Sequence, residues 1–319
     1  MTRFPNLAAV LFAFPAATPL LASEDIADQY PQSPLYSKPV EVIPNVWSAI
    51  GATAPPTYEN TGHNNNLSFL VTGDGVVVIN GGAAAVLAEA LHTEIKAVTD
   101  QPVKLVINEN GQGHAVLGNS YWAAQGVPIL AHEDAAHEVE QFGHQLLQEM
   151  QGYNRDKAEG TVVQGPTLTF ADSYDASMGD MRIEVLHLGP AHSPGDIQVW
   201  LPDLGLVIAG DMAFHERMLP IFPDTITSEW IETWDNAFEA LGATYVIPGH
   251  GHPTNMDQVR RYTRDYLTYL RERIGEHLDA GGGLAEAYYV DQTPFAHLDT
   301  YEELATKNAG RVFEEMEFE

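Results

Sequence analysis

The chain passes twice through the same order of apolar and amphipathic segments, and this repetition limits its fold more than any other feature. A hairpin comes first, because the apolar runs 67–71 and 76–79 flank the turn Gly73-Asp74-Gly75. A helix is predicted over 84–99, where apolar residues recur at helical spacing. The remaining segments of this half are short strands at 42–43, 46–50, 103–107 and 128–131, a helix at 119–125, and an acidic, exposed helical stretch at 133–158.

The second half repeats this order. Strands are predicted at 161–170, 182–188, 197–201, 205–209 and 244–247, and a helix at 230–241. Helices packed on the outer sides of two sheets would bury such strands. The sequence therefore predicts an α/β fold.

The two ends of the chain differ from this middle. From residue 256 the apolar residues are spaced by three or four up to Leu278, and Gly281-Gly282-Gly283 ends that helix. The last residues predict a helical cap with a solvated acidic end at 314–319. A structural role for the chain is also possible, in which 256–319 binds a partner. Deleting 256–319 would then remove the partner and leave the rest of the chain intact.

The N-terminus has the pattern of an export signal. Arg3 supplies a positive start, residues 7–14 are apolar, and Leu20-Leu21-Ala22 precedes a cleavage site. Residues 1–22 are therefore predicted to be a signal peptide, followed by a polar, Pro-rich lead-in at 23–40, and the mature protein to be periplasmic or secreted. The alternative is a frayed apolar N-terminus, since three prolines interrupt the stretch.

Composition excludes several classes of partner. The net charge of −29 repels nucleic acid and anionic membranes, while 45% hydrophobic residues are too many for a disordered acidic protein. The chain has no cysteine, so any metal must be held by nitrogen and oxygen ligands. We expect a small-molecule substrate, and no membrane insertion of the mature chain.

Four Gly- or Pro-rich turns follow apolar strands and carry polar side chains. Such turns let the backbone approach a ligand closely and fix the direction of a side chain. The four segments are Ile107-Asn108-Glu109-Asn110-Gly111-Gln112-Gly113-His114, Gly189-Pro190-Ala191-His192-Ser193-Pro194-Gly195-Asp196, Ala209-Gly210-Asp211-Met212 and Ile247-Pro248-Gly249-His250-Gly251-His252-Pro253.

The order and flanking residues of these segments resemble the metallo-β-lactamase superfamily over about 41–255. The resemblance implies a four-layer αβ/βα sandwich, with the site at one edge between the sheets. The helical segment 256–319 then follows this domain as a C-terminal extension. The resemblance places His192, Asp211 and His250 at metal-ligand positions, with Asp211 as the bridging carboxylate.

The first motif departs from the family pattern His-x-His-x-Asp-His. The corresponding residues here are Asn110, Gln112, His114 and Ala115, and Asn80 replaces the usual Asp after the hairpin. Neutral amides are poor zinc ligands compared with imidazole. His114, Asp211 and His250 still form two imidazoles and a carboxylate around an open position. We therefore expect one divalent metal, with zinc preferred over iron or manganese, and His192 beside it.

The resemblance implies a hydrolase in which a metal-bound water attacks an ester, lactam or similar bond. Asp211 and His114 are the predicted catalytic residues, and Asn110 and Gln112 would donate hydrogen bonds in a pocket that also includes Asn80 and His215. The alternative is a non-catalytic ligand-binding relative that has lost its metal, with His114 merely starting a helix.

Three further residues are less informative. Glu109 could move a proton, but an exposed carboxylate at the end of a strand is the preferred interpretation. His63 is interpreted as a loop residue and His132 as a surface residue.

Overall fold

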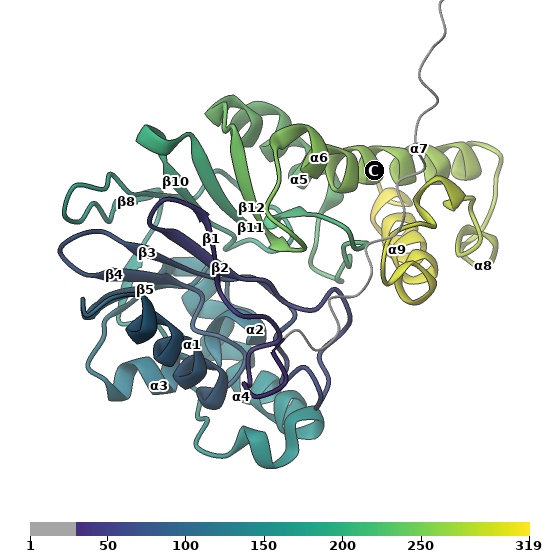
Figure 1. The fold of residues 1–319 in the computed structure, drawn as a ribbon. Coiled ribbons are helices and arrows are strands. Elements are labelled where there is room, and N and C mark those ends of the chain that lie inside the picture. Colours follow the sequence, from purple (N-terminus) through teal and green to yellow (C-terminus); the bar gives the residue numbers. More distant parts are fainter. Residues whose placement is uncertain (1–29) are drawn as a thin grey trace, which may run out of the picture.

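The computed structural model describes residues 30–319 (Figure 1). The predicted signal peptide and residues 23–29 of the lead-in lie outside the described residues. Two sheets face each other, and helices cover the outer side of each, which confirms the predicted four-layer α/β sandwich. Within 30–319, none of the helices combines the length and apolar character needed to cross a bilayer.

The first sheet is built from the N-terminal half of the chain. Its strands run in sequence order, antiparallel from β1 to β4 and parallel from β4 to β7. They are β1 (Val40–Ile43), β2 (Val46–Ala49), β3 (Leu67–Val71), β4 (Val76–Ile79), β5 (Val103–Ile107), β6 (Ile129–His132) and β7 (Leu168–Phe170). The helices of this half are α1 (Ala85–Val98), α2 (Gly113–Val116), α3 (Asn119–Ala124) and α4 (Glu133–Asn154).

The second sheet has the order β12-β11-β10-β9-β8, and only its β11–β12 pair is parallel within the described chain. Its strands are β8 (Ser173–Asp175), β9 (Glu184–Leu186), β10 (Gln198–Leu201), β11 (Leu206–Phe214) and β12 (Tyr245–His250). The helices that follow are α5 (Thr227–Thr233), α6 (Met256–Tyr262), α7 (Arg264–Asp279), α8 (Leu284–Ala287) and α9 (Tyr301–Met316).

Some predicted elements differ from the structure. The strand expected at 161–170 is reduced to β7, because Pro166 lacks the N–H that a ladder needs and the preceding residues form a loop. The strand expected at 182–188 is limited to β9, and β8 was not predicted. The helix expected at 230–241 starts at Thr227 and changes to a π-helix at Trp234–Phe238.

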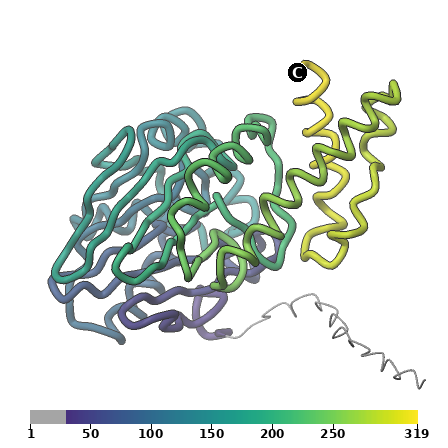
Figure 2. Tube along the Cα trace, turned by 90° about the horizontal axis from the view of Figure 1, so that it is seen from above, coloured from purple at the N-terminus to yellow at the C-terminus, as the bar shows by residue number. Residues whose placement is uncertain are grey.

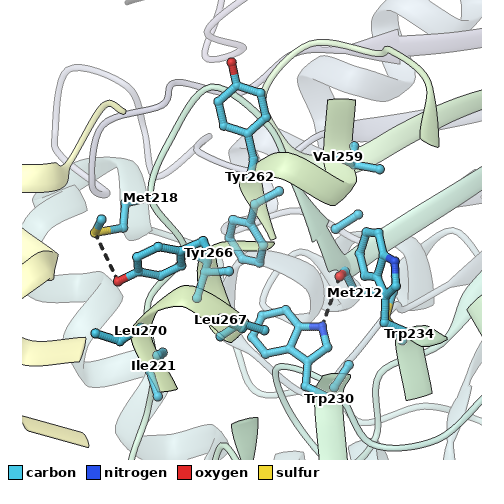
Figure 3. Close-up of a cluster of buried hydrophobic side chains, with 14 of the residues drawn as sticks. Met212, Met218, Ile221, Trp230, Trp234, Val259, Tyr262, Tyr266, Leu267 and Leu270 are labelled. Atoms are coloured by element: carbon cyan, nitrogen blue, oxygen red, sulfur yellow. Dashed lines mark hydrogen bonds between the residues drawn. The ribbon is translucent and has the colours of Figure 1, made fainter. Parts of the chain in front are cut away.

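Each layer is joined to the next by its own apolar cluster. Side chains from both sheets, such as Ile79 and Ile208, pack in the centre, while Leu87 of α1 and Trp122 of α3 cover the first sheet. On the second sheet, the Trp230 indole N–H donates to the Met212 carbonyl at 3.1 Å (Figure 3). This hydrogen bond holds the backbone of β11 at Met212, the residue that follows Asp211.

The C-terminal helices lie beside the second sheet, with α9 packed against α7 (Figure 2). Asn308 of α9 accepts a hydrogen bond from the Ile221 N–H at 3.0 Å and donates one to the Leu219 carbonyl at 2.8 Å. The extension therefore holds the segment that follows β11.

The acidic end at 314–319 was expected to be solvated, and this is wrong for Glu315, whose side chain is 13% exposed. Its carboxylate accepts hydrogen bonds from the backbone N–H groups of Thr227 and Ser228 at 3.0 and 3.1 Å. It also pairs with Arg271 at 2.7 Å. Glu315 thus caps the first turn of α5, which has no side-chain cap of its own.

Replacing Glu315 by Ala is expected to lower the free energy of unfolding by about 2–3 kcal/mol, because the first turn of α5 loses its acceptors and Arg271 loses its partner. Urea denaturation measures this change. Glu314→Ala is the matched control, since Glu314 is 49% exposed in a surface pair with Arg311; its expected cost is below about 0.5 kcal/mol. Equal losses in the two variants would contradict the capping role.

Candidate metal centre

Three predicted ligands converge at the edge between the sheets. One ligand atom from each of His114, Asp211 and His250 lies within 4.8 Å of the others. His114 Nε2 is 3.5 Å from Asp211 Oδ2, and His250 Nε2 is 3.3 Å from Asp211 Oδ1. Metal bonds of about 2.0–2.2 Å place neighbouring ligands of a tetrahedral ion about 3.3–3.6 Å apart. The spacing therefore suits a divalent metal.

Strand pairing and glycine bring these side chains together. Asp211 lies within β11, and His250 ends the parallel strand β12 beside it. A Cβ on Gly249 would lie 2.4 Å from Asp211 Oδ1, and a Cβ on Gly210 would lie 2.6 Å from a carboxylate oxygen of Glu109. The two glycines thus leave the space that two buried carboxylates occupy.

The hydrogen bonding of Asp211 and His250 also suits a cation. Asp211 Oδ1 is buried and has no hydrogen-bond partner among residues 30–319. His250 Nδ1 contacts the Asn64 carbonyl oxygen, so we assign the proton to Nδ1 and the lone pair to Nε2, which faces Asp211. A ring N–H that donates to a backbone carbonyl is the usual outer contact of a metal-binding histidine.

His192 and the two substituted amides lie on the other side of Asp211. His192 Nδ1 is 2.8 Å from Gln112 Nε2 and 3.6 Å from Asp211 Oδ2, but His192 is not part of the converging group. Asn110 Nδ2 donates to Asp211 Oδ2 at 3.2 Å and to Asp196 Oδ1 at 3.1 Å. Asn110 therefore occupies the Oδ2 side of Asp211, which His114 also approaches, and leaves Oδ1 to His250.

Glu109 is buried, at 2% exposure, so its interpretation as an exposed carboxylate is wrong. Its Oε1 is 3.1 Å from His114 Nε2. Its backbone is fixed from both sheets, because its N–H donates to Asn80 Oδ1 at 3.0 Å and its carbonyl accepts from the Ile197 N–H at 2.8 Å. Asn80 thus positions the backbone of this segment.

Burial and neighbouring charged side chains determine which residues of the site are ionised. Burial raises the pKa of Glu109 and of Asp196, and it lowers the pKa of His250 to about 4. Burial opposes ionisation of Asp211 too, but the nearby histidines hold its pKa well below the usual range. Burial also opposes protonation of His114, whose pKa is nevertheless raised by the carboxylates of Asp211 and Glu109. Asp211 is therefore the ionised centre of the site.

A cavity of about 830 Å³ opens onto this centre and is lined by His114, His192, Asp211, His250 and Gln112. Three predicted pocket residues, Asn80, Asn110 and His215, are not among its lining residues. His215 Nδ1 instead contacts the His252 carbonyl oxygen at 2.9 Å, and its ring packs against Tyr262.

Arg217 lines this cavity, although it is 6% exposed. It lies two residues after His215, and its Nη1 is 3.4 Å from His250 Nδ1. Burial lowers its pKa to about 10, so it remains a cation at neutral pH. The only sequence signal for Arg217 was its place shortly after the Ala-Gly-Asp motif.

Two other histidines are buried away from the cavity lining. His132 is 3% exposed, so its interpretation as a surface residue is wrong; it stacks on His187 with ring centroids 3.9 Å apart. His63 lies in the loop before β3, its Nδ1 accepts a hydrogen bond from the Tyr36 N–H at 2.8 Å, and burial lowers its pKa to about 4.

His63 should make the fold sensitive to acid. The unfolded chain takes up a proton near pH 6.5 that native His63 accepts only near pH 4, so stability is lost as the pH falls between these values. The expected loss is about 3 kcal/mol. Urea denaturation in chelating buffer at pH 7 and pH 4.5 should show a smaller pH effect for His63→Asn than for the wild type. His137→Asn is the control, because the His137 side chain is 83% exposed. An unchanged pH effect in His63→Asn would contradict this role.

The chain is similar in sequence to one protein family and to several known proteins. A family model described as the metallo-beta-lactamase superfamily matches residues 114–250. A linear primary-alkylsulfatase of Pseudomonas sp. is 22% identical over 247 residues, which is 65% of this chain and 46% of the relative. A metallo-beta-lactamase type 2 of Bacteroides fragilis is 27% identical over 193 residues, which is 57% of this chain and 70% of the relative.

Among solved structures, the stereoselective inverting sec-alkylsulfatase of Pseudomonas sp. superimposes with a TM-score of 0.66 at 17% identity. The match covers 88% of this chain, a share that residues 1–255 alone cannot supply, so the likeness in fold includes C-terminal helices. It covers 50% of that structure, so the chain spans about half the length of the alkylsulfatases that it matches.

Proposed function

The chain belongs to the metallo-β-lactamase superfamily, and we propose that it is a hydrolase that uses one divalent metal held by His114, Asp211 and His250. The observation that carries this proposal is the unpartnered, buried Asp211 Oδ1, which faces the Nε2 lone pair of His250. Two imidazoles and a carboxylate suit zinc first, and iron or manganese next.

When bound, such a metal acts as a Lewis acid and makes a water molecule nucleophilic near neutral pH. The remaining roles belong to residues of the chain. Asn110 orients the Asp211 carboxylate through its hydrogen bond to Oδ2. Gln112 lines the cavity and can donate to a substrate oxygen, and Arg217 offers a buried cation to an electron-rich oxygen of the reacting group.

An ester is the preferred substrate type, ahead of a lactam. Relatives named as alkylsulfatases and as acyl-coenzyme A thioesterases support this choice, and so does the fold likeness to an alkylsulfatase that extends into the C-terminal helices. A single metal is supported by the amides of Asn110 and Gln112, which stand where the family pattern has imidazoles.

The test is a panel of aryl carboxylic esters, a lactone, an aryl sulfate ester and a chromogenic β-lactam, assayed with protein loaded with zinc, manganese or iron(II). We expect turnover of at least one ester that a chelator removes and the metal restores. Absence of turnover across the panel with metal-loaded protein would contradict the hydrolase proposal.

A ligand-binding protein without metal is the second candidate. It is favoured by two contacts, of Asn110 with Asp211 Oδ2 and of Gln112 with His192 Nδ1. These contacts give both atoms a hydrogen-bond partner without an ion. This candidate predicts that added metal leaves the melting temperature unchanged, whereas the hydrolase proposal predicts an increase.

A further inference from the structure

The cavity above the metal centre has a size that suits an extended small molecule. Its volume of about 830 Å³ lies in the upper part of the range of about 300–1,000 Å³ for small-molecule sites. Its charged lining residues are mainly acidic, with Asp211, Glu138, Glu149, Asp224 and Glu303 against Arg217 and Lys307. This acidic excess does not favour an anionic ligand, so the apolar lining residues are the informative part.

One wall is an apolar stripe on α4. Phe142, Leu146 and Met150 are spaced by four residues, so they lie on one face of the helix. Met150 is fully buried, Leu146 is half-buried and Phe142 is 42% exposed. Leu117 packs with Leu146 and Met150 at the buried end. The stripe thus runs from the protein interior toward solvent.

Further apolar lining comes from the segment after β11 and from α9. Phe222 is 41% exposed, and its ring centroid lies 4.9 Å from that of His192. Thr225 fixes this segment by donating to the His192 carbonyl at 2.8 Å, while Asn308 of α9 holds Ile221. Leu304 of α9 also lines the cavity, so the C-terminal extension helps to shape it.

Two half-exposed phenylalanines in one cavity lining are best explained by a ligand that covers them. Burying apolar surface is favourable, and each methylene that leaves water raises affinity by about four-fold. A polar or highly charged ligand would gain nothing from Phe142, Leu146 or Phe222.

We infer that the substrate carries a hydrocarbon chain, with its reacting group at His114, Asp211 and His250 and its chain along Leu146 and Phe142 toward solvent. Phe142, Leu146 and Phe222 then determine specificity for chain length. This inference rests on the proposed hydrolase function for the reacting group, whereas binding of the chain can be measured without catalysis.

The first experiment follows kcat/KM of the metal-loaded protein along p-nitrophenyl esters from acetyl to dodecanoyl. We expect kcat/KM to rise by about four-fold per methylene until the cavity is filled. Phe142→Asp should reduce the ratio of kcat/KM for the dodecanoyl ester to that for the acetyl ester by about ten-fold or more, as a carboxylate interrupts the stripe. Gln141→Asp is the matched control, because Gln141 is the exposed neighbour on α4 outside the cavity lining, and it should leave the ratio unchanged.

The second experiment titrates metal-free protein with 1-decanol and with 1-butanol by calorimetry. We expect decanol to bind and butanol not to bind, and Phe142→Asp to weaken decanol binding. If esters are cleaved with a flat dependence on chain length and decanol does not bind, the inference is overturned while the hydrolase function stands. If no ester is cleaved but decanol binds in a Phe142-dependent manner, the chain site is supported and the hydrolase function fails.

Discussion

Replacing Asp211 by Asn is expected to remove metal binding and hydrolysis together. Asp211 is the ionised carboxylate that faces both His114 and His250, and an amide of the same size has no charge to offer a cation. We expect metal affinity to fall by more than about 100-fold and kcat/KM by about 10³-fold or more. Calorimetric zinc titration and the ester assay measure the two effects.

Asp196→Asn is the matched control for this variant. Asp196 is an equally buried acid next to Asn110, but its oxygens already accept hydrogen bonds from Ser193 at 2.7 and 3.0 Å. We expect this variant to keep its metal, with affinity within about ten-fold of wild type. An Asp211→Asn protein that binds metal and cleaves ester as the wild type does would contradict the assignment of Asp211.

Replacing Gly249 by Ala has the second largest expected effect. The added Cβ would lie 2.4 Å from Asp211 Oδ1 and 2.7 Å from the Gly210 carbonyl carbon, and neither atom belongs to a flexible side-chain end with free space. Strands β11 and β12 must move apart at Asp211. We expect a loss of about 3 kcal/mol or more in the free energy of unfolding, together with loss of high-affinity metal binding.

Gly152→Ala gives the comparison for the Gly249 variant. Gly152 lies in α4, and a Cβ there meets no atom within 4 Å. Alanine at an open helical position should stabilise the protein by about 0.5–1 kcal/mol. Normal metal affinity in Gly249→Ala would show that the close packing around Asp211 is not needed for the site.

Local sequence patterns predicted the elements whose signals are themselves local. The hairpin at β3–β4 follows from an Asp-Gly turn between β-branched runs, and α1 follows from apolar residues at helical spacing. β7 is only the last part of the strand expected at 161–170, and it pairs with β6, which lies 38 residues earlier. β8 has three residues, too few for a periodic pattern, and it pairs with the equally short β9.

The residues of the site also fall into those that local motifs predict and those whose surroundings come from distant parts of the sequence. Asp211 and His250 stand in motifs that could be read directly, and the structure brings both together with His114. The burial of Glu109 was missed because its surroundings come from Gly210 on the other sheet and from His114. The capping role of Glu315 was missed for a related reason, since an acidic run predicts solvation and its hydrogen-bond donors lie almost 90 residues earlier, at Thr227 and Ser228.

The most direct test of the central claim is the molar ratio of metal to protein. Protein purified without chelator is equilibrated with zinc, manganese or iron(II), freed of excess ion, and measured by elemental analysis beside the Asp211→Asn variant. One metal per wild-type chain and none in the variant is the predicted result. Two metals per wild-type chain, or none with any of the three ions, would contradict a single centre built from His114, Asp211 and His250.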